Sequence, residues 1–201
     1  MEILSIRKEA SSEMKVTETS LEGVFVIEPT VFGDHRGWFM ETYNDGKFKE
    51  LGIDLIFIQD NQSFSATKGT LRGLHYQLNP HAQTKLIRCT RGAIYDVAVD
   101  IRKGSPNYGK WFGIELNAEN KKQLLVPKGF AHGFMTLTED VEVQYKVDEL
   151  YAPEHDRGIV WNDSAISIEW PIDINPVLSE KDEKAPALSD AENNFVWEDN
   201  K

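Results

Sequence analysis

Short runs of alternating apolar and polar residues fill most of the chain, and Gly, Pro, Asn and Asp separate one run from the next. Between positions 93 and 100, for example, successive side chains divide into two sets, as expected for a strand with two different faces. We expect strands at 24–28, 38–43, 55–63, 70–77, 85–101, 111–116, 123–126, 133–137, 141–147, 159–161 and 166–170. Such a series is typical of all-β sandwiches and barrels.

Helical patterns are short. Residues 47–51 lie between two glycines, with Asp45 as a possible N-cap, and residues 178–184 form a second short helix or turn. No segment is long enough to supply the helix of a βαβ unit. The predicted fold class is therefore all-β, a cupin or jelly-roll barrel with a few short helices near the middle and the C-terminus.

The start of the chain differs from the rest. The first thirteen residues are polar and aperiodic, and Met14 opens a better pattern. A frayed terminus is the simplest interpretation of such a segment. We therefore expect residues 1–13 to be a flexible N-terminal extension and residues 14–201 to form a single cupin or jelly-roll domain.

Charge and composition exclude several classes of protein. The formal net charge of −11 argues against a general nucleic-acid binder, because phosphate backbones require a basic surface. The single cysteine, Cys89, rules out an internal disulfide and fits a reducing compartment. No apolar run approaches membrane-spanning length, and residues 1–14 lack the apolar core of a signal peptide. A cytoplasmic protein with neither nucleic-acid nor membrane partners is expected.

The segment 70–77 carries a histidine and an arginine on an otherwise strand-like pattern. Strict alternation would place His75 on one face of the strand and Arg72 on the other. Gly73 lies between them and permits a β-bulge, a feature that re-aims side chains at barrel rims and active sites. The sequence alone leaves open whether His75 is a core histidine or a base.

Two further residues are unusual for their strands. Alternation directs Tyr145 inward with the valines of 141–147, and Lys85 shares its face with Ile87 and Cys89. A buried tyrosine needs a partner for its hydroxyl, and an apolar surrounding is costly for a lysine. The structural alternatives are that Tyr145 is a core tyrosine whose hydroxyl is hydrogen-bonded, and that Lys85 reaches water from the end of its strand. His132, in a glycine-flanked turn, is by itself more often structural than catalytic.

The sequence gives little support for a metal site or for a catalytic nucleophile. Barrels of this kind often hold a metal with clustered histidines and a carboxylate. Here positions 75–77 read His-Tyr-Gln, where a metal site would favour two histidines separated by one residue. His35, His81 and His155 lie in expected turns among polar residues. We expect neither a metal nor a cofactor, and no glycine-rich phosphate loop or nucleophile elbow is present in the sequence.

Taken together, these stretches resemble the dTDP-4-dehydrorhamnose 3,5-epimerase family, the cupin-fold enzymes of dTDP-L-rhamnose synthesis. The resemblance runs from about Met14 to Pro186 through an ordered set of blocks: Glu28-Pro29, FGDHRGWF (32–39), FIQDN (57–61), LRGLH (71–75), DVAVDIR (96–102), PKGFAHGF (127–134), WND (161–163) and LSEKD (178–182). Two parts of the chain lie outside it, the first thirteen residues and an acidic tail from Asp190.

The resemblance implies a metal-free homodimer that exchanges an N-terminal strand and acts on a dTDP-linked 4-keto-6-deoxyhexose. The implied reaction epimerises C3 and C5 of dTDP-4-dehydro-6-deoxy-D-glucose to give dTDP-4-dehydro-L-rhamnose. Similarity assigns His75 as the base, Asp182 as its partner carboxylate, Tyr145 as the acid, and Lys85 and His132 as residues around the sugar. Positions that match nucleotide, diphosphate or sugar contacts are Arg36, Glu41, Gln59, Asn61, Arg72, Asp156 and Lys181, with Arg36 and Glu41 serving the neighbouring subunit.

Three alternatives remain open at this point. A related cupin could epimerise only C3 or only C5, or move the ketone between C3 and C4, although a ketoisomerase would be expected to lack the acid at Tyr145. The second alternative is a metal-dependent cupin enzyme. The third is a non-catalytic module that binds nucleotide sugars, against which the joint presence of base, carboxylate, lysine and acid argues.

Overall fold

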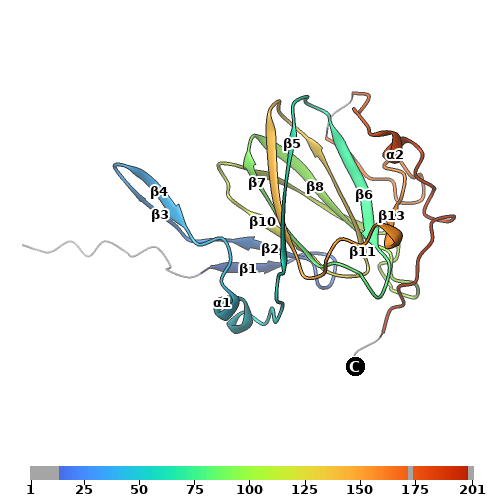
Figure 1. Cartoon of the computed structure of the whole chain (residues 1–201), viewed down its shortest axis with the longest axis horizontal. Helices are drawn as coiled ribbons and strands as arrows, with labels where there is room; N and C mark the ends of the chain where they lie inside the picture. The colour runs from blue at the N-terminus through green and yellow to red at the C-terminus, as the bar shows by residue number, and fades with distance from the viewer. Residues whose placement is uncertain (1–13, 172–173, 199–201) are drawn as a thin grey trace, which may run out of the picture.

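Two antiparallel sheets pack face to face in the computed structural model, which describes residues 14–171 and 174–198 (Figure 1). The larger sheet has the order β1 (Lys15–Glu18), β2 (Phe25–Glu28), β10 (Gln123–Val126), β7 (Lys85–Arg91), β12 (Val141–Val147) and β5 (Gln59–Ser65). The smaller sheet has the order β13 (Asp156–Gly158), β6 (Leu71–Gln77), β11 (Phe130–Thr136), β8 (Ala93–Asp100) and β9 (Trp111–Asn117). The predicted all-β barrel is confirmed.

A separate hairpin projects away from the two sheets. It consists of β3 (Val31–Asp34) and β4 (Gly37–Met40), which among the described residues pair only with each other. Figure 1 shows it extending from the end of the larger sheet that carries β1 and β2. Its apolar side chains are exposed, with Phe39 at 68% and Trp38 at 59% of their full accessible surface. A hairpin of this composition has no core of its own to bury these rings.

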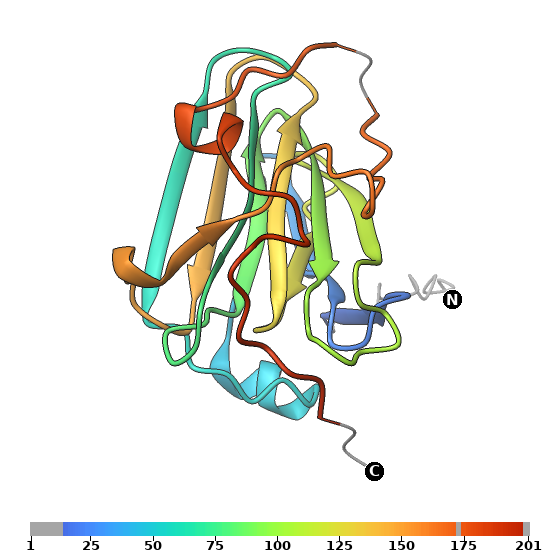
Figure 2. The same ribbon diagram turned by 90° about the vertical axis from the view of Figure 1, so that its right-hand side faces the viewer.

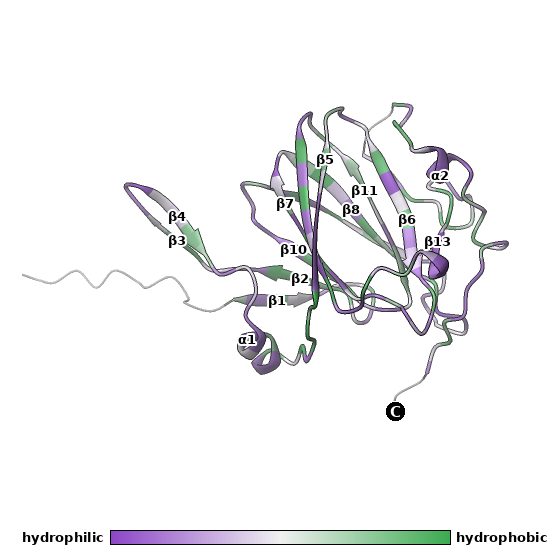
Figure 3. Ribbon diagram, viewed as in Figure 1, coloured by the Kyte–Doolittle hydropathy of each residue, from purple (hydrophilic) through white to green (hydrophobic). Residues whose placement is uncertain are grey.

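Apolar and polar residues follow one another along the strands (Figure 3), and the buried apolar residues form three layers. The central layer joins both sheets and includes Ile87, Val143 and Phe134. Leu86 faces the opposite way from Ile87 and packs with Phe48 on the outer side of the larger sheet. A third cluster covers the outer side of the smaller sheet.

The short helices follow the expected positions. Helix α1 (Asp45–Glu50) begins after Asn44, whose side chain accepts a hydrogen bond from the Lys47 amide at 3.1 Å. The expected cap at Asp45 is therefore wrong by one residue, because Asp45 already belongs to the first turn. Helix α2 (Glu180–Glu183) lies within the expected segment, and the side chain of Ser179 caps it. A 3₁₀ turn, η1 (Pro153–His155), precedes β13.

Several strand predictions are wrong. Residues 159–161 and 166–170 do not join a sheet, and the observed strand β13 ends just before the first of these segments. Ile159 and Ile166 are nevertheless buried against the smaller sheet, so their apolar pattern reported burial rather than strand pairing. Strands β1 and β3 were not expected. The division at residue 13 remains a prediction, because residues 1–13 lie outside the described part of the chain.

Within the described ranges, no helix is long and apolar enough to cross a bilayer.

A β-bulge interrupts β6 at the expected place. His75 is the partner of His132 on β11, and Arg72 is the partner of Phe134, so two residues of β6 face the single residue Gly133. Gly73 has a φ of 131°, a conformation that other residues rarely adopt. A Cβ added at Gly73 would lie 2.6 Å from the Cα of Gly133. The bulge shifts the alternation of β6 by one position between Arg72 and His75.

We predict that Gly73→Ala lowers the free energy of unfolding by about 3 kcal/mol or more, because the methyl group meets backbone atoms and φ is unfavourable. Denaturant-induced unfolding followed by fluorescence measures the change. Gly46→Ala is the matched control, since its added Cβ meets only the Asn44 side chain at 3.4 Å and the site is helical. Equal unfolding midpoints for wild type and Gly73→Ala would contradict the close approach of β6 and β11.

Candidate active site

A cavity of about 440 Å³ lies between β6, β7, β11 and β12. It holds six of the residues predicted for the site. These are Arg72 and His75 of β6, Lys85 of β7, His132 of β11, Tyr145 of β12 and Asp182 of α2. The bulge at Gly73 explains how Arg72 and His75 both reach this cavity, although strict alternation would have separated them.

His75 and Asp182 form a hydrogen-bonded pair. The Nε2 atom of His75 lies 2.5 Å from Oδ1 of Asp182, whose side chain is only 4% exposed. Burial alone would raise the pKa of the Asp182 carboxyl. Hydrogen bonds and charge from the His75 ring, helped by Ser179 and the Gly73 amide, outweigh burial and lower that pKa. Asp182 is thus a carboxylate that fixes the ring of His75 and leaves Nδ1 free.

The chain brings Asp182 back to β6 through a defined set of backbone contacts. Val177 forms a parallel bridge with Thr70, donating to Gly69 O and accepting from the Leu71 amide, both at 3.0 Å. Ser179 then starts α2 by accepting a hydrogen bond from the Asp182 amide at 3.2 Å. A three-residue capping interval therefore directs Asp182 into the cavity.

Lys85 occupies the first position of β7, next to the cavity. It makes no ion pair within residues 14–171 and 174–198. Burial lowers its pKa to about 8, although the carboxylates of Asp156 and Asp96 counteract part of this effect. An ammonium group that is desolvated and unpaired interacts strongly with any negative charge that develops nearby.

Tyr145 points inward with the valines of β12, as predicted. Its hydroxyl has no hydrogen-bond partner in the described part of the chain, so it is not the satisfied core tyrosine of the structural alternative. Burial raises the pKa of Tyr145, while the Arg72 guanidinium partly offsets that increase. The phenol is thus protonated at neutral pH and directed at the cavity.

A second histidine–carboxylate pair lies across the cavity. His132 Nε2 is 2.7 Å from Asp96 Oδ1, and both side chains are buried. The other carboxylate oxygen of Asp96 is buried without a hydrogen-bond partner among the described residues. Asp96 was not predicted as a site residue. Its position on the inward face of an apolar strand was the available signal, because a carboxylate there is costly unless it is paired.

A smaller hollow of about 260 Å³ adjoins the cavity and shares His75, Lys85 and Tyr145 with it. Three predicted binding residues, Gln59, Asn61 and Asp156, line this hollow. Gln59 donates a hydrogen bond to Asn61 at 2.9 Å. Asp156 accepts a hydrogen bond from the Tyr151 hydroxyl at 3.3 Å and pairs with the ammonium of Lys181. Polar groups therefore continue from the cavity to the edge of the smaller sheet.

Arg72 lies at the rim with an exposed side chain. Its Nε donates to Ser65 Oγ at 3.1 Å, and its Nη2 donates to Phe64 O at 3.0 Å. These two bonds hold the guanidinium in place and leave part of its planar fork available for an anion.

Two predicted residues do not join the site of their own chain. Arg36 lies in the turn of the projecting hairpin and pairs with Asp34 at 2.5 Å. Glu41 follows β4 and pairs with Lys47 at 2.7 Å. The hairpin extends away from the cavity-bearing barrel in Figure 1, so neither side chain serves the cavity within one chain.

The sequence prediction also missed residues that line the two hollows. Ser63 and Ser179 line the larger one, and Tyr151 lines the smaller one. Ser63 shares the inward parity of β5 with Asn61, which was a usable signal. The buried Oγ of Ser63 has no hydrogen-bond partner among the described residues.

In residues 14–171 and 174–198, no group of three or more His, Cys, Asp or Glu side chains is arranged to hold a metal ion.

Comparisons with known proteins show which family the chain resembles. The family model described as dTDP-4-dehydrorhamnose 3,5-epimerase matches residues 18–190. The Shigella flexneri protein named dTDP-4-dehydrorhamnose 3,5-epimerase is 53% identical over 180 residues, covering 89% of this chain and 98% of the relative. A Streptomyces protein named dTDP-4-dehydro-6-deoxyglucose 3-epimerase is 38% identical over 174 residues, covering 86% and 88% of the two chains.

A solved structure shows the same fold. The crystal structure of a dTDP-6-deoxy-D-glucose-3,5-epimerase from Legionella pneumophila, in complex with dTDP-4-keto-L-rhamnose, matches with a TM-score of 0.85 at 43% identity. The match covers 88% of this chain and 94% of that chain. With a family model spanning residues 18–190 and a relative at 53% identity, the chain belongs to the dTDP-4-dehydrorhamnose 3,5-epimerase family.

Proposed function

We propose that the cavity around His75 converts dTDP-4-dehydro-6-deoxy-D-glucose into dTDP-4-dehydro-L-rhamnose by inverting C3 and C5. The observation that carries this proposal is the convergence of the His75–Asp182 pair, Lys85 and Tyr145 on one cavity. Family membership supplies the substrate class, and the cavity supplies groups that suit the chemistry.

The C4 carbonyl acidifies the hydrogens on both C3 and C5, because removal of either gives an enolate. His75 takes the proton through Nδ1, and the Asp182 carboxylate stabilises the imidazolium that forms. Lys85 stabilises the negative charge that develops on the C4 oxygen, for which one preorganised donor contributes about 3–4 kcal/mol. Tyr145 then delivers a proton to the opposite face of the carbon. Each inversion breaks one C–H bond and forms another.

The remaining polar residues bind the nucleotide part of the substrate. Arg72 at the rim offers a planar fork for the diphosphate. Gln59, Asn61 and Asp156 line the smaller hollow, Lys181 pairs with Asp156, and these four residues contact the sugar or the nucleotide. His132 contacts the sugar from β11. The overall negative charge of the protein is compatible with an anionic ligand because the basic groups are local.

The proposed role of Arg36 requires a second subunit. We propose a homodimer in which the N-terminal segment is exchanged, so that Arg36 and Glu41 reach the cavity of the neighbouring chain. The exposed apolar rings of Phe32, Trp38 and Phe39 support such an arrangement, since a partner would cover them. The location in the cytoplasm also remains a prediction, with which the free and buried Cys89 is compatible.

Isotope incorporation tests the reaction. In deuterated water, with a 4-keto reductase to trap the product, wild type should place deuterium at both C3 and C5 of an L-sugar. His75→Ala should slow exchange at both carbons by about a hundredfold or more, because the general base is lost. Tyr145→Phe should impair formation of epimerised product more than exchange at the first carbon.

The controls separate the alternatives. Tyr95→Phe alters a tyrosine on the outer side of the smaller sheet and should behave as wild type. Deuterium at only one carbon would assign the chain to the single-centre epimerases, and loss of activity in chelator would indicate a metal enzyme. Undiminished exchange in His75→Ala would disprove the role of His75 as the base. If wild type shows no exchange at all, the protein only binds nucleotide sugars and does not epimerise them.

The pKa of Lys85 gives a pH prediction. Above pH 8 the side chain loses the charge that stabilises the enolate, so kcat/KM should fall as pH rises through about 8. Lys85→Met should have a much lower kcat/KM, and its kcat/KM should not fall as pH rises through about 8. The unfolded chain keeps the proton up to the ordinary pKa of 10.5, so this residue makes unfolding less favourable as pH rises from 8 to 10.5. Denaturant titrations across that window therefore distinguish deprotonation from unfolding.

Subunit mixing tests the exchanged arm. Arg36→Ala and His75→Ala should each be nearly inactive as pure dimers. A heterodimer of the two variants should recover about half of the wild-type rate, because Arg36 from one chain completes the cavity that still has His75 in the other. If both residues serve the cavity of their own chain, the heterodimer stays inactive, and a monomeric wild type in light scattering would also contradict the proposal.

A further inference from the structure

The chain continues past the region matched by the family model, which ends at residue 190. This continuation lies across the outer side of the smaller sheet (Figure 2), where Phe195 is buried in the apolar cluster of that sheet. We propose that residues Glu192–Trp197 form a C-terminal clasp that positions strand β13, and with it Asp156, at the substrate site. This inference rests on the proposed function of the cavity.

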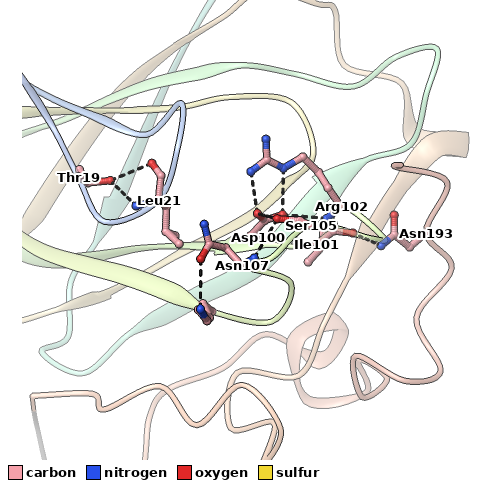
Figure 4. Close-up of polar contacts among 9 residues, drawn as sticks. Thr19, Leu21, Asp100, Ile101, Arg102, Ser105, Asn107 and Asn193 are labelled. Atoms are coloured by element: carbon pink, nitrogen blue, oxygen red, sulfur yellow. Dashed lines mark hydrogen bonds and ion pairs between the residues drawn. The ribbon is translucent and has the colours of Figure 1, made fainter. Parts of the chain in front are cut away.

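One end of the clasp is fixed to the turn after β8. The Lys103 amide donates to Phe195 O at 3.0 Å, and the Trp197 amide donates to Lys103 O at 2.9 Å. The Asn193 side chain donates to Ile101 O beside the Asp100–Arg102 pair (Figure 4). The guanidinium of Arg102 also lies 4.4 Å above the Trp197 ring. These contacts hold the clasp at several points along its length.

The other end joins two strands. The hydroxyl of Tyr76, on β6, donates to the backbone oxygen of Glu192 at 2.5 Å. Arg157, on β13, donates from Nε to the carboxylate of Glu192 at 2.7 Å. Tyr76 and Arg157 are direct partners in the ladder between β6 and β13. Glu192 therefore connects both members of one cross-strand pair from the outside of the sheet.

The neighbouring pairs in the same ladder carry the site. Asp156 is the partner of Gln77, and Gly158 is the partner of His75. Strand β13 has only three residues and forms the edge of its sheet, so its own ladder constrains it weakly. Arg157 adds to that constraint, because its Nη1 donates to Glu154 O at 2.9 Å and to Asp156 O at 3.0 Å. One guanidinium thus links the clasp to the corner that presents Asp156.

The clasp acts on binding rather than on proton transfer. Asp156 holds Lys181 and contacts Tyr151 at the smaller hollow. Lys85 and Tyr145 lie on β7 and β12, which are paired on both sides with strands other than β13, and His75 lies on β6, which is also held by β11 on its other side. The Glu192–Arg157 pair is partly exposed, with side-chain exposures of 63% and 31%, so it adds little to global stability. A change at Glu192 should therefore alter substrate affinity without unfolding the protein.

Substitution of Glu192 tests the clasp in the full-length chain. Glu192→Ala should raise KM for the dTDP-4-keto sugar by about threefold or more while kcat stays within about twofold of wild type. Glu192→Gln keeps an acceptor oxygen, so its KM should lie between those of wild type and Glu192→Ala. Tyr76→Phe, which removes only the bond to the Glu192 backbone, should change KM in the same direction. Asp190→Ala removes the same charge two residues earlier and should match wild type.

Amide hydrogen exchange supplies a readout that does not need turnover. In Glu192→Ala, exchange should speed up in the peptide that contains residues 153–160 and stay unchanged in the centre of β11. Unchanged exchange at 153–160 would overturn the clasp, and faster exchange with unchanged KM would overturn its link to the substrate. If wild type does not turn over the sugar nucleotide, the proposed function fails, whereas the exchange data still decide for or against the positioning of β13.

Discussion

The hydrogen bond between His75 and Asp182 joins residues 107 positions apart, and much of the site depends on it. The carboxylate reaches the ring because a parallel bridge at Thr70 and Val177 returns the chain to the start of β6, after which Ser179 caps α2. Each of these contacts is local and modest. Their combined effect is to place a buried carboxylate against one ring nitrogen, so that the other nitrogen is available and the tautomer is defined.

The buried surroundings of this pair shift the pKa values of the neighbouring groups in different directions. Burial lowers the pKa of Lys85 and raises that of Tyr145, since it disfavours the charged form of both groups. For Asp182 the hydrogen bonds outweigh burial, and its pKa is lowered instead. One desolvated space thus contains a stable carboxylate, a phenol that keeps its proton and an ammonium that yields its proton at about pH 8. Such contrasts define the roles of acid, base and electrostatic partner.

Strand parity predicted much of this arrangement from the sequence. The inward directions of Tyr145 and Lys85 followed from alternation with valines and with Ile87, because a two-residue period survives in a regular strand. The proximity of Arg72 and His75 did not follow from it, because the bulge at Gly73 changes the count, and glycine indicates only that a bulge is permitted. Asp182 could be assigned only by family resemblance, since no local pattern indicates which strand a distant helix will approach. The strands expected at 159–161 and 166–170 were wrong for a related reason: apolar runs report burial, and Ile159 and Ile166 are buried without ladder partners.

Two segments outside the barrel are proposed to act on substrate binding. The hairpin of β3 and β4 has exposed aromatic rings and an arginine that lies away from the cavity of its own chain, and the proposed exchange between subunits would account for both features. The C-terminal clasp does the opposite: it packs on its own chain and fixes the edge strand that bears Asp156. Neither segment belongs to β6, β7 or β12, the strands that carry His75, Lys85 and Tyr145. On these proposals, affinity for the nucleotide sugar is set at the periphery of the fold, while the chemistry depends on strands that the barrel cannot alter without losing its core.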